Sequence, residues 1–248
     1  MLDVKKYRDL MSSVELAKSQ EQVKALFQEF CNASDFEYYL FASICSVNSL
    51  SSPQVLTISN YPDEWIKTYF SEKLQKHDPV VKYCFENTSP IRWDKLIKMD
   101  KYTDHYGEGV MQRAASLGLV NGLSIPVNTR SGEIAIFSLA SKRDENIDER
   151  MMKVLSYAQV FGALAMDTFQ RLRRDEPGRK KEKLTPREIE CLFWACEGKT
   201  TWEISKIVDV SERTIIFHLT SATKKLGAVN RQHAVAKAII SGLVRPMP

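Results

Sequence analysis

The chain has 248 residues, of which 44% are hydrophobic and 27% charged, and its formal net charge is +4. This composition is that of an ordinary globular protein, and the length suits two domains of roughly 170 and roughly 65 residues. No apolar run approaches the ~18–20 residues of a membrane span, and the charged N-terminus lacks the apolar core of a signal peptide. We therefore expect a cytoplasmic protein without membrane contacts.

The cysteines and histidines indicate neither a disulfide framework nor a metal centre. The five cysteines are an odd number without a C-x-x-C motif, and the four histidines are scattered. We expect reduced, buried thiols, no metal and no cofactor.

The first two thirds of the chain alternate predicted helices and strands. The helical segments, from apolar spacing, are 5–30, 62–73, 79–86, 106–117 and the long amphipathic 148–173. The expected strands are 36–45, 54–59, 122–126 and 133–140. This order predicts an α/β sandwich, in which helices flank an antiparallel sheet and a ligand can lie between the sheet and one helical layer.

Aromatic and acidic residues gather in the middle of this domain. Tyr61, Trp65 and Tyr69 recur every four residues, so their rings share one helix face or lie at its start. Asp78 precedes a predicted helix, and Trp93 follows fifteen residues later. An aromatic stripe at helical spacing most often belongs to the hydrophobic core, and an Asp just before a helix is most often its N-cap. Three rings with polar tips, a carboxylate and a second Trp could nevertheless line a pocket for a small, partly polar molecule.

A linker separates the two domains. The segment 171–183 has almost no apolar side chains and includes Pro177 and Gly178, so we expect a flexible hinge and place the linker at 173–183. The resulting domains are 1–172 and 184–248. From residue 173 onward there are 15 Lys and Arg against 9 Asp and Glu (net +6), whereas residues 1–172 carry 20 against 22 (net −2).

Helix start and stop signals divide the second domain into four helices. A capping box formed by Thr185 and Glu188 opens the first helix, and Gly198 ends it. A second box, at 200–203, opens a short second helix, which a tight turn at 209–211 joins to the third. Two short helices joined by a tight turn, the second longer and basic, are typical of a helix-turn-helix. A small helical bundle with a solvated basic face is the alternative.

The third helix has distinct inner and outer positions. Its apolar residues, which are spaced by four, three and four, are Ile215, Leu219, Ala222 and Leu226. The same spacing turns another set outward, toward a DNA major groove: Arg213, Ile216, Thr220 and Lys224. Further candidate DNA contacts, in the cap regions and along the helix, are Thr201, Ser211, Thr214, His218 and Lys225. The concentration of positive charge on this domain favours phosphate binding.

The second domain resembles the C-terminal domain of LuxR-type regulators. The resemblance rests on the segments 184–188, 197–200, 203–205, 211–215, 217–219 and 225–227. It implies a four-helix DNA-binding fold but does not identify the signal, because the same domain follows several kinds of sensor. At the position of Ile216 members of the family usually carry a polar or basic residue. An isoleucine there can pack on a thymine methyl but cannot hydrogen-bond to a base edge.

The first domain resembles the acyl-homoserine-lactone-binding domain of the same family. The matching residues are Tyr61, Pro62, Trp65, Tyr69, Asp78, Pro79, Val80, Val81, Trp93 and Gly122. The resemblance implies that Trp65 donates to the lactone carbonyl, Tyr61 donates to the amide carbonyl, and Asp78 accepts from the amide N–H. It further implies that Tyr69 and Trp93 pack around the lactone ring and that Ser138 helps to hold the acyl amide or a 3-oxo group.

These resemblances together imply a quorum-sensing transcriptional regulator, usually an activator, rather than an enzyme. It would bind an N-acyl-homoserine lactone and then, as a homodimer, an inverted-repeat operator in double-stranded DNA, with contact to RNA polymerase as the family's usual outcome. One alternative is an orphan regulator of the same type that needs no ligand or a different one. A lactonase or acylase is disfavoured because the chain lacks a G-x-S-x-G elbow and a His-rich metal motif.

Overall fold

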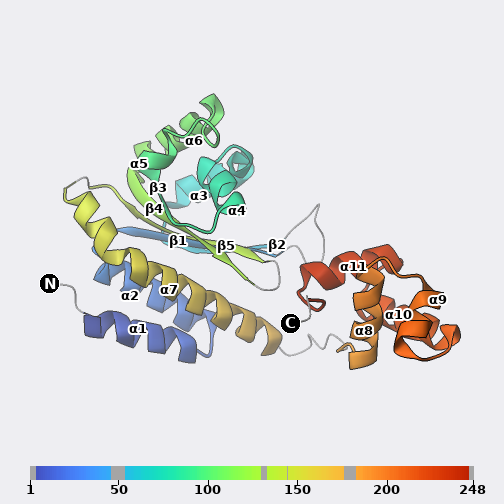
Figure 1. Ribbon diagram of the computed structural model, residues 1–248. Coiled ribbons are helices and arrows are strands. Elements are labelled where there is room, and N and C mark those ends of the chain that lie inside the picture. The colour runs from blue at the N-terminus through green and yellow to red at the C-terminus, as the bar shows by residue number, and fades with distance from the viewer. Residues whose placement is uncertain (1–3, 46–53, 130–132, 144, 176–182, 246–248) are drawn as a thin grey trace. The chain divides into compact units, whose positions relative to one another are not determined.

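The computed structural model describes residues 4–45, 54–129, 133–143, 145–175 and 183–245 (Figure 1). They fall into two compact units, one containing the sheet with α1 to α7 and the other α8 to α11. Among the described residues, no helix has both the length and the apolar character needed to cross a membrane.

The first unit is built on a five-stranded sheet with the order β2-β1-β5-β4-β3. Its strands are β1 (Tyr38–Cys45), β2 (Gln54–Ser59), β3 (Ile91–Arg92), β4 (Asn121–Asn128) and β5 (Ile134–Ser141). β5 pairs antiparallel with β1 and β4, and β4 pairs antiparallel with β3. The predicted antiparallel sheet with flanking helices is thereby confirmed.

Helices lie against both faces of this sheet (Figure 1). One layer consists of α1 (Val4–Leu16), α2 (Gln20–Ala33) and α7 (Ile147–Asp175). The other layer consists of α3 (Asp63–Ser71), the short 3₁₀ helix η1 (Leu74–Lys76), α4 (Pro79–Glu86), α5 (Trp93–Leu96) and α6 (His105–Ser116).

The two faces of the sheet bury different cores, as period-two alternation along strands requires. On β5, Phe137 and Leu139 belong to an aromatic-rich core with α1, α2 and α7. Their neighbours Ile136 and Ala140 belong to a second core, which also contains the candidate ligand residues Tyr61, Trp65 and Trp93. The alternation therefore places Ser138 on the second face, between Ile136 and Ala140.

The structure differs from the predicted elements at several boundaries. The helical segment 5–30 is two helices, because Ser19 caps a new helix by accepting from Gln22 N. The long helix continues to Asp175, so residues 173–175, which we had placed in the linker, are helical. Residues 176–182 of the predicted linker lie outside the described residues. The short elements β3 and α5 carry no periodic signal and were not predicted.

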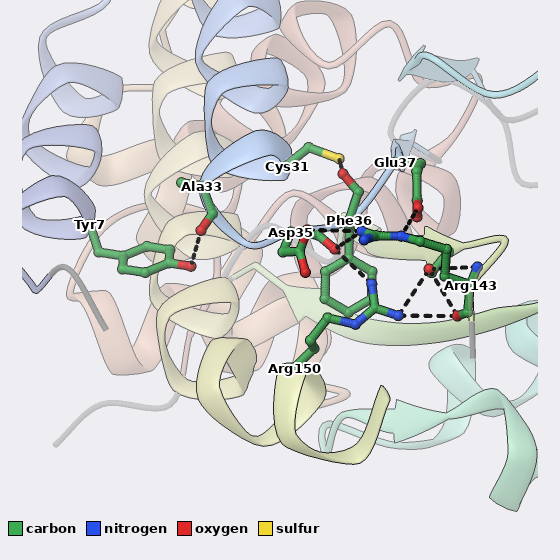
Figure 2. Close-up of polar contacts among 9 residues, drawn as sticks. Tyr7, Cys31, Ala33, Asp35, Phe36, Glu37, Arg143 and Arg150 are labelled. Carbon is green, nitrogen blue, oxygen red and sulfur yellow. Dashed lines mark hydrogen bonds and ion pairs between the residues drawn. The ribbon is translucent and has the colours of Figure 1, made fainter. Parts of the chain in front are cut away.

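A buried arginine joins the start of α7 to the turn between α2 and β1 (Figure 2). The Arg150 guanidinium donates to the Asp35 carbonyl oxygen (2.7 Å) and to Ser141 Oγ (3.1 Å), and it lies 5.3 Å from the centre of the Phe36 ring. Arg143 forms an ion pair with the Asp35 carboxylate (2.8 Å). These contacts fix the N-terminal end of α7 against the sheet.

The second unit contains four helices: α8 (Pro186–Cys196), α9 (Thr201–Val208), α10 (Glu212–Lys225) and α11 (Arg231–Ile240). Both predicted capping boxes are present, at Thr185 and at Thr200. Gly198 follows the first helix with a φ of +77°, a left-handed conformation that favours glycine. The core includes Ile215, Leu219 and Ala222, with Leu226 partly buried against it.

Candidate ligand site and nucleic-acid interface

The predicted ligand residues converge on the second face of the sheet. Tyr61, Trp65 and Trp93 are buried there in one core, and Tyr69 packs against it. Trp65 and Tyr69 lie on α3 with their rings 5.5 Å apart, while Tyr61 directly precedes that helix. Asp78 and Ser138 complete the group from the start of α4 and from β5.

Asp78 is both a helix cap and the partner of a tyrosine. Its Oδ1 accepts from Val80 N (2.8 Å), which caps α4, and its Oδ2 accepts from the Tyr69 hydroxyl (2.7 Å). Burial raises the pKa of Asp78 above its ordinary value, and the bonds from Tyr69 and from the Val80 backbone oppose that rise. Asp78 is therefore the helix cap that its position predicted. Its carboxylate can still accept a hydrogen bond from a ligand, because each oxygen has two lone pairs.

The Tyr61 hydroxyl is buried without a hydrogen-bond partner among the described residues. Burial raises the pKa of Tyr61, the Asp78 carboxylate adds to the rise, and the Ser138 hydroxyl opposes it. Within the same described ranges, no hydrogen bond involves the Trp65 indole N–H. A buried polar group without a partner is costly, and beside the other candidate ligand residues it is consistent with a site that another molecule completes.

A hydrogen-bonded chain lies beside these residues and includes a serine that we did not predict. The Trp93 indole N–H donates to Ser124 Oγ (2.8 Å), and Ser124 Oγ lies 2.8 Å from Ser138 Oγ. Period-two alternation on the strand places Ser124 on the same face as Gly122, which was part of the family match. That alternation is the sequence signal by which Ser124 could have been found.

The group offers a mixed set of hydrogen-bonding atoms among the aromatic side chains of the second core. The donors are the Tyr61 hydroxyl and the Trp65 indole N–H, and the acceptor is the Asp78 carboxylate. A ligand with both carbonyl and N–H groups matches such a set, because each of its buried polar atoms then finds a partner. In the part of the chain that the structure describes, no cluster of His, Cys, Asp and Glu is arranged to hold a metal ion.

The second unit presents α10 as the candidate DNA-reading helix. Four of its predicted groove-facing residues are exposed, and Ile216 is 55% exposed; the four are Arg213, Ile216, Thr220 and Lys224. Ser211 caps α10 by accepting from Thr214 N, and its hydroxyl also bonds that of Thr214 (2.9 Å). Thr201 begins α9, and its hydroxyl accepts a long hydrogen bond (3.4 Å) from Arg231. His218, on α10, is partly exposed beside Phe217.

Lys225 has contacts inside the domain that the sequence did not indicate. Its Nζ donates to Glu188 Oε2 (2.9 Å), and the Ser221 hydroxyl donates to Glu188 Oε1 (2.6 Å). The Glu188 side chain is only 4% exposed, and that of Lys225 is 17% exposed. Lys225 therefore joins α10 to α8, and its contact with DNA phosphate stays a prediction.

Comparisons with known proteins assign both units. Residues 19–172 match the family described as autoinducer binding domain, and residues 182–238 match that described as bacterial regulatory proteins, luxR family. The chain is 35% identical to the transcriptional activator protein LuxR of Aliivibrio fischeri over 95% of this chain and 93% of that protein. It is also 35% identical to the quorum sensing-dependent transcriptional regulator RpaR of Rhodopseudomonas palustris, over 94% and 95% of the two chains. The fold is similar to crystalline SdiA of Escherichia coli, with a TM-score of 0.79, 23% identity and coverage of 97% and 98%.

Proposed function

From the premise that the chain belongs to the LuxR family of transcriptional regulators, with an autoinducer-binding domain and a helix-turn-helix, we propose that its ligand is an N-acyl-homoserine lactone. The loaded protein binds an inverted-repeat operator as a homodimer and activates transcription in quorum sensing. The domain boundaries that we propose are 1–172 for the sensor and 184–248 for the DNA-binding domain.

The observation that carries the ligand proposal is the buried Tyr61 hydroxyl, which has no hydrogen-bond partner among the residues described and lies in one core with Trp65, within electrostatic reach of Asp78. Tyr61 donates to the amide carbonyl, Asp78 accepts from the amide N–H, and Trp65 donates to the lactone carbonyl. Tyr69 and Trp93 pack around the ring, and Ser138 bonds the acyl amide or a 3-oxo group. The acyl tail lies along apolar residues of the same face, such as Leu40 and Val80.

A panel of lactones should raise the melting temperature and soluble yield of the full-length protein in a manner that depends on chain length. The ligand binds the folded state and not the unfolded chain, so it stabilises by mass action. The Asp78→Asn variant should need at least tenfold more lactone for the same rise in melting temperature, because a charge-assisted bond is replaced by a weaker one. Melting temperature against lactone concentration is the measurement.

The asparagine variant separates the two roles of this residue. Asn is as good an N-cap as Asp, so the fold without ligand should be nearly as stable as that of the wild type, whereas Asp78→Ala should also lose about 1 kcal/mol of capping. Equal stability of the wild type with every lactone would reject the proposed ligand. It would leave an orphan regulator with another ligand or none.

The proposed dimer determines the form of the operator. The long helix α7 and the C-terminal helix α11 are the proposed contacts between two copies. A two-fold dimer requires an inverted repeat whose half-sites lie about one DNA turn apart. Arg213, Thr220 and Lys224 face the groove in this arrangement, with Thr201, Ser211, Thr214, His218 and Lys225 near its edges and the phosphates. RNA polymerase is the proposed partner at the promoter.

Ile216 should read a thymine methyl. In an operator selected from random DNA, replacing the thymine beneath Ile216 by deoxyuracil, which lacks only that methyl, should weaken binding about fourfold. The Ile216→Ala variant should bind both operators equally, since its side chain no longer covers the methyl. Titration of fluorescent duplexes at constant salt measures this, and equal sensitivity of both proteins to the replacement would contradict the assignment.

A further inference from the structure

Ser124 lies at the centre of the hydrogen-bonded chain beside the proposed ligand site. It accepts from the Trp93 indole N–H, and its oxygen lies 2.8 Å from that of Ser138. Ser124 is fully buried and Ser138 is 3% exposed. The two serines are directly opposite each other on β4 and β5, so the pairing of the strands fixes their separation.

The direction of the bond between the serines follows from counting protons. An indole nitrogen can only donate, so Ser124 Oγ must accept from Trp93. If Ser138 donated to Ser124, the Ser124 proton would be buried with no acceptor among the described residues. If Ser124 donates instead, its proton is used and the one left over belongs to Ser138. The second arrangement is favoured because it leaves no proton of the fully buried hydroxyl unpaired.

The remaining proton of Ser138 lies beside a second unused donor. The Tyr61 hydroxyl is buried without a hydrogen-bond partner in the described part of the chain, and the neighbouring Ser138 hydroxyl opposes the rise in its pKa. Two neighbouring hydroxyls on the same face of the sheet, among the aromatic residues of the second core, can both donate to an acceptor placed between them. A carbonyl oxygen is the acceptor that fits, because it has two lone pairs and carries no proton of its own.

We propose that Ser124 is a positioning residue that holds the Ser138 hydroxyl as a hydrogen-bond donor to a carbonyl oxygen of the bound ligand. This inference rests on the proposed function, in which the ligand is an acyl-homoserine lactone with such a carbonyl. Ser124 itself does not touch the ligand. Ser124 therefore affects the affinity for the ligand only when the Ser138 hydroxyl is present. This dependence distinguishes Ser124 from a residue that merely fills the core.

The test is a double-mutant cycle on the full-length protein. Equilibrium dialysis with the radiolabelled lactone that gives the largest stabilisation measures the dissociation constants of the wild type, Ser124→Ala, Ser138→Ala and the double variant. Each single change should weaken binding about fivefold, the loss expected for one neutral hydrogen bond. The double variant should bind no more weakly than Ser138→Ala, because Ser124 then has nothing to position.

Two further variants complete the experiment. Ser124→Thr keeps the hydroxyl and should restore most of the affinity. The matched control is Ser43→Ala, which removes another buried strand hydroxyl, one for which the described ranges offer no hydrogen-bond partner, and should leave lactone binding unchanged. If Ser124→Ala does not fold, the same cycle is run with Ser124→Cys, whose thiol is a weak donor.

The outcomes distinguish this inference from the function on which it rests. If the wild type binds lactone and Ser124→Ala weakens binding by the same factor with or without the Ser138 hydroxyl, Ser124 acts through general packing and the positioning role is wrong. If the wild type binds no lactone at all, the proposed ligand and the positioning role both fail.

Discussion

A single methyl group added at Gly122 is expected to lower the melting temperature of the sensor unit by about 5 °C and to weaken lactone binding. A Cβ at this position would lie 2.3, 2.4 and 2.6 Å from three atoms of the Trp93 indole ring. Ordinary contacts begin near 3.4 Å, so the ring must move by about an ångström or more. The ring is buried and bonded to Ser124, and its displacement therefore disturbs both the core and the hydrogen-bonded chain.

Gly109→Ala is the matched control for this prediction. Gly109 lies inside α6, and an added Cβ would meet no atom within 4 Å. Alanine there should leave the melting temperature unchanged or raise it slightly, because it reduces the freedom of the unfolded chain. In the Gly122→Ala background, Trp93→Phe should lose less stability than in the wild type, since the smaller ring relieves the clash. Additive losses would show that the contact is not the cause.

The sequence was sufficient for the elements with strong periodicity and for nominating candidate ligand residues that the structure brings together, but not for contacts between elements. Tyr61, Trp65 and Trp93 were predicted as candidates, and the structure buries them in one core. Ser124 was not predicted, because its role depends on which strand lies opposite β4 and on the approach of Trp93. Strand pairing of this kind is determined by the packing of the whole unit, which no local pattern contains.

The DNA-binding unit shows the same division between local and non-local information. The capping box of Thr185 and Glu188 is local, with a spacing of three residues, and was predicted correctly. Lys225 was predicted only as an exposed phosphate contact, because its helical position is near the outer face. Its ion pair with Glu188 spans 37 residues, and only the packing of α10 on α8 reveals it.

Replacing Glu188 by glutamine is expected to destabilise the DNA-binding unit by about 3 kcal/mol. The buried carboxylate accepts from the Ser221 hydroxyl, from Lys225 Nζ and from the backbone N–H of Thr185 (2.7 Å). Glutamine can still complete a capping box, so the substitution mainly leaves Lys225 without its counter-charge. Hydrogen exchange of the amide protons in α8 and α10 of the full-length protein, resolved by peptide, measures the loss.

The same carboxylate should make this unit sensitive to acid. Burial by itself raises the pKa of Glu188, but the bonds from Ser221, the Thr185 backbone and Lys225 outweigh it and lower the pKa from 4.5 to about 2. Because the pKa of the folded state lies below that of the unfolded chain, the stabilisation is fully present above pH 4.5. It is lost progressively as the pH falls from 4.5 toward 2. In Glu188→Gln that part of the acid dependence should be absent.

Glu203 provides the internal comparison, since it occupies the same position in the second capping box. It accepts from the Thr200 backbone N–H (2.7 Å) and hydroxyl (2.8 Å), but both bonds lie at the surface. Glu203→Gln should therefore change the exchange of α9 very little, because solvent replaces what the charge supplied. Equal losses in the two variants would mean that the local capping box, and not the ion pair between α8 and α10, determines the stability of the unit. A larger loss in Glu188→Gln, present above pH 4.5 and diminishing as the pH falls toward 2, identifies the buried pair as the contact that holds the DNA-reading helix in place.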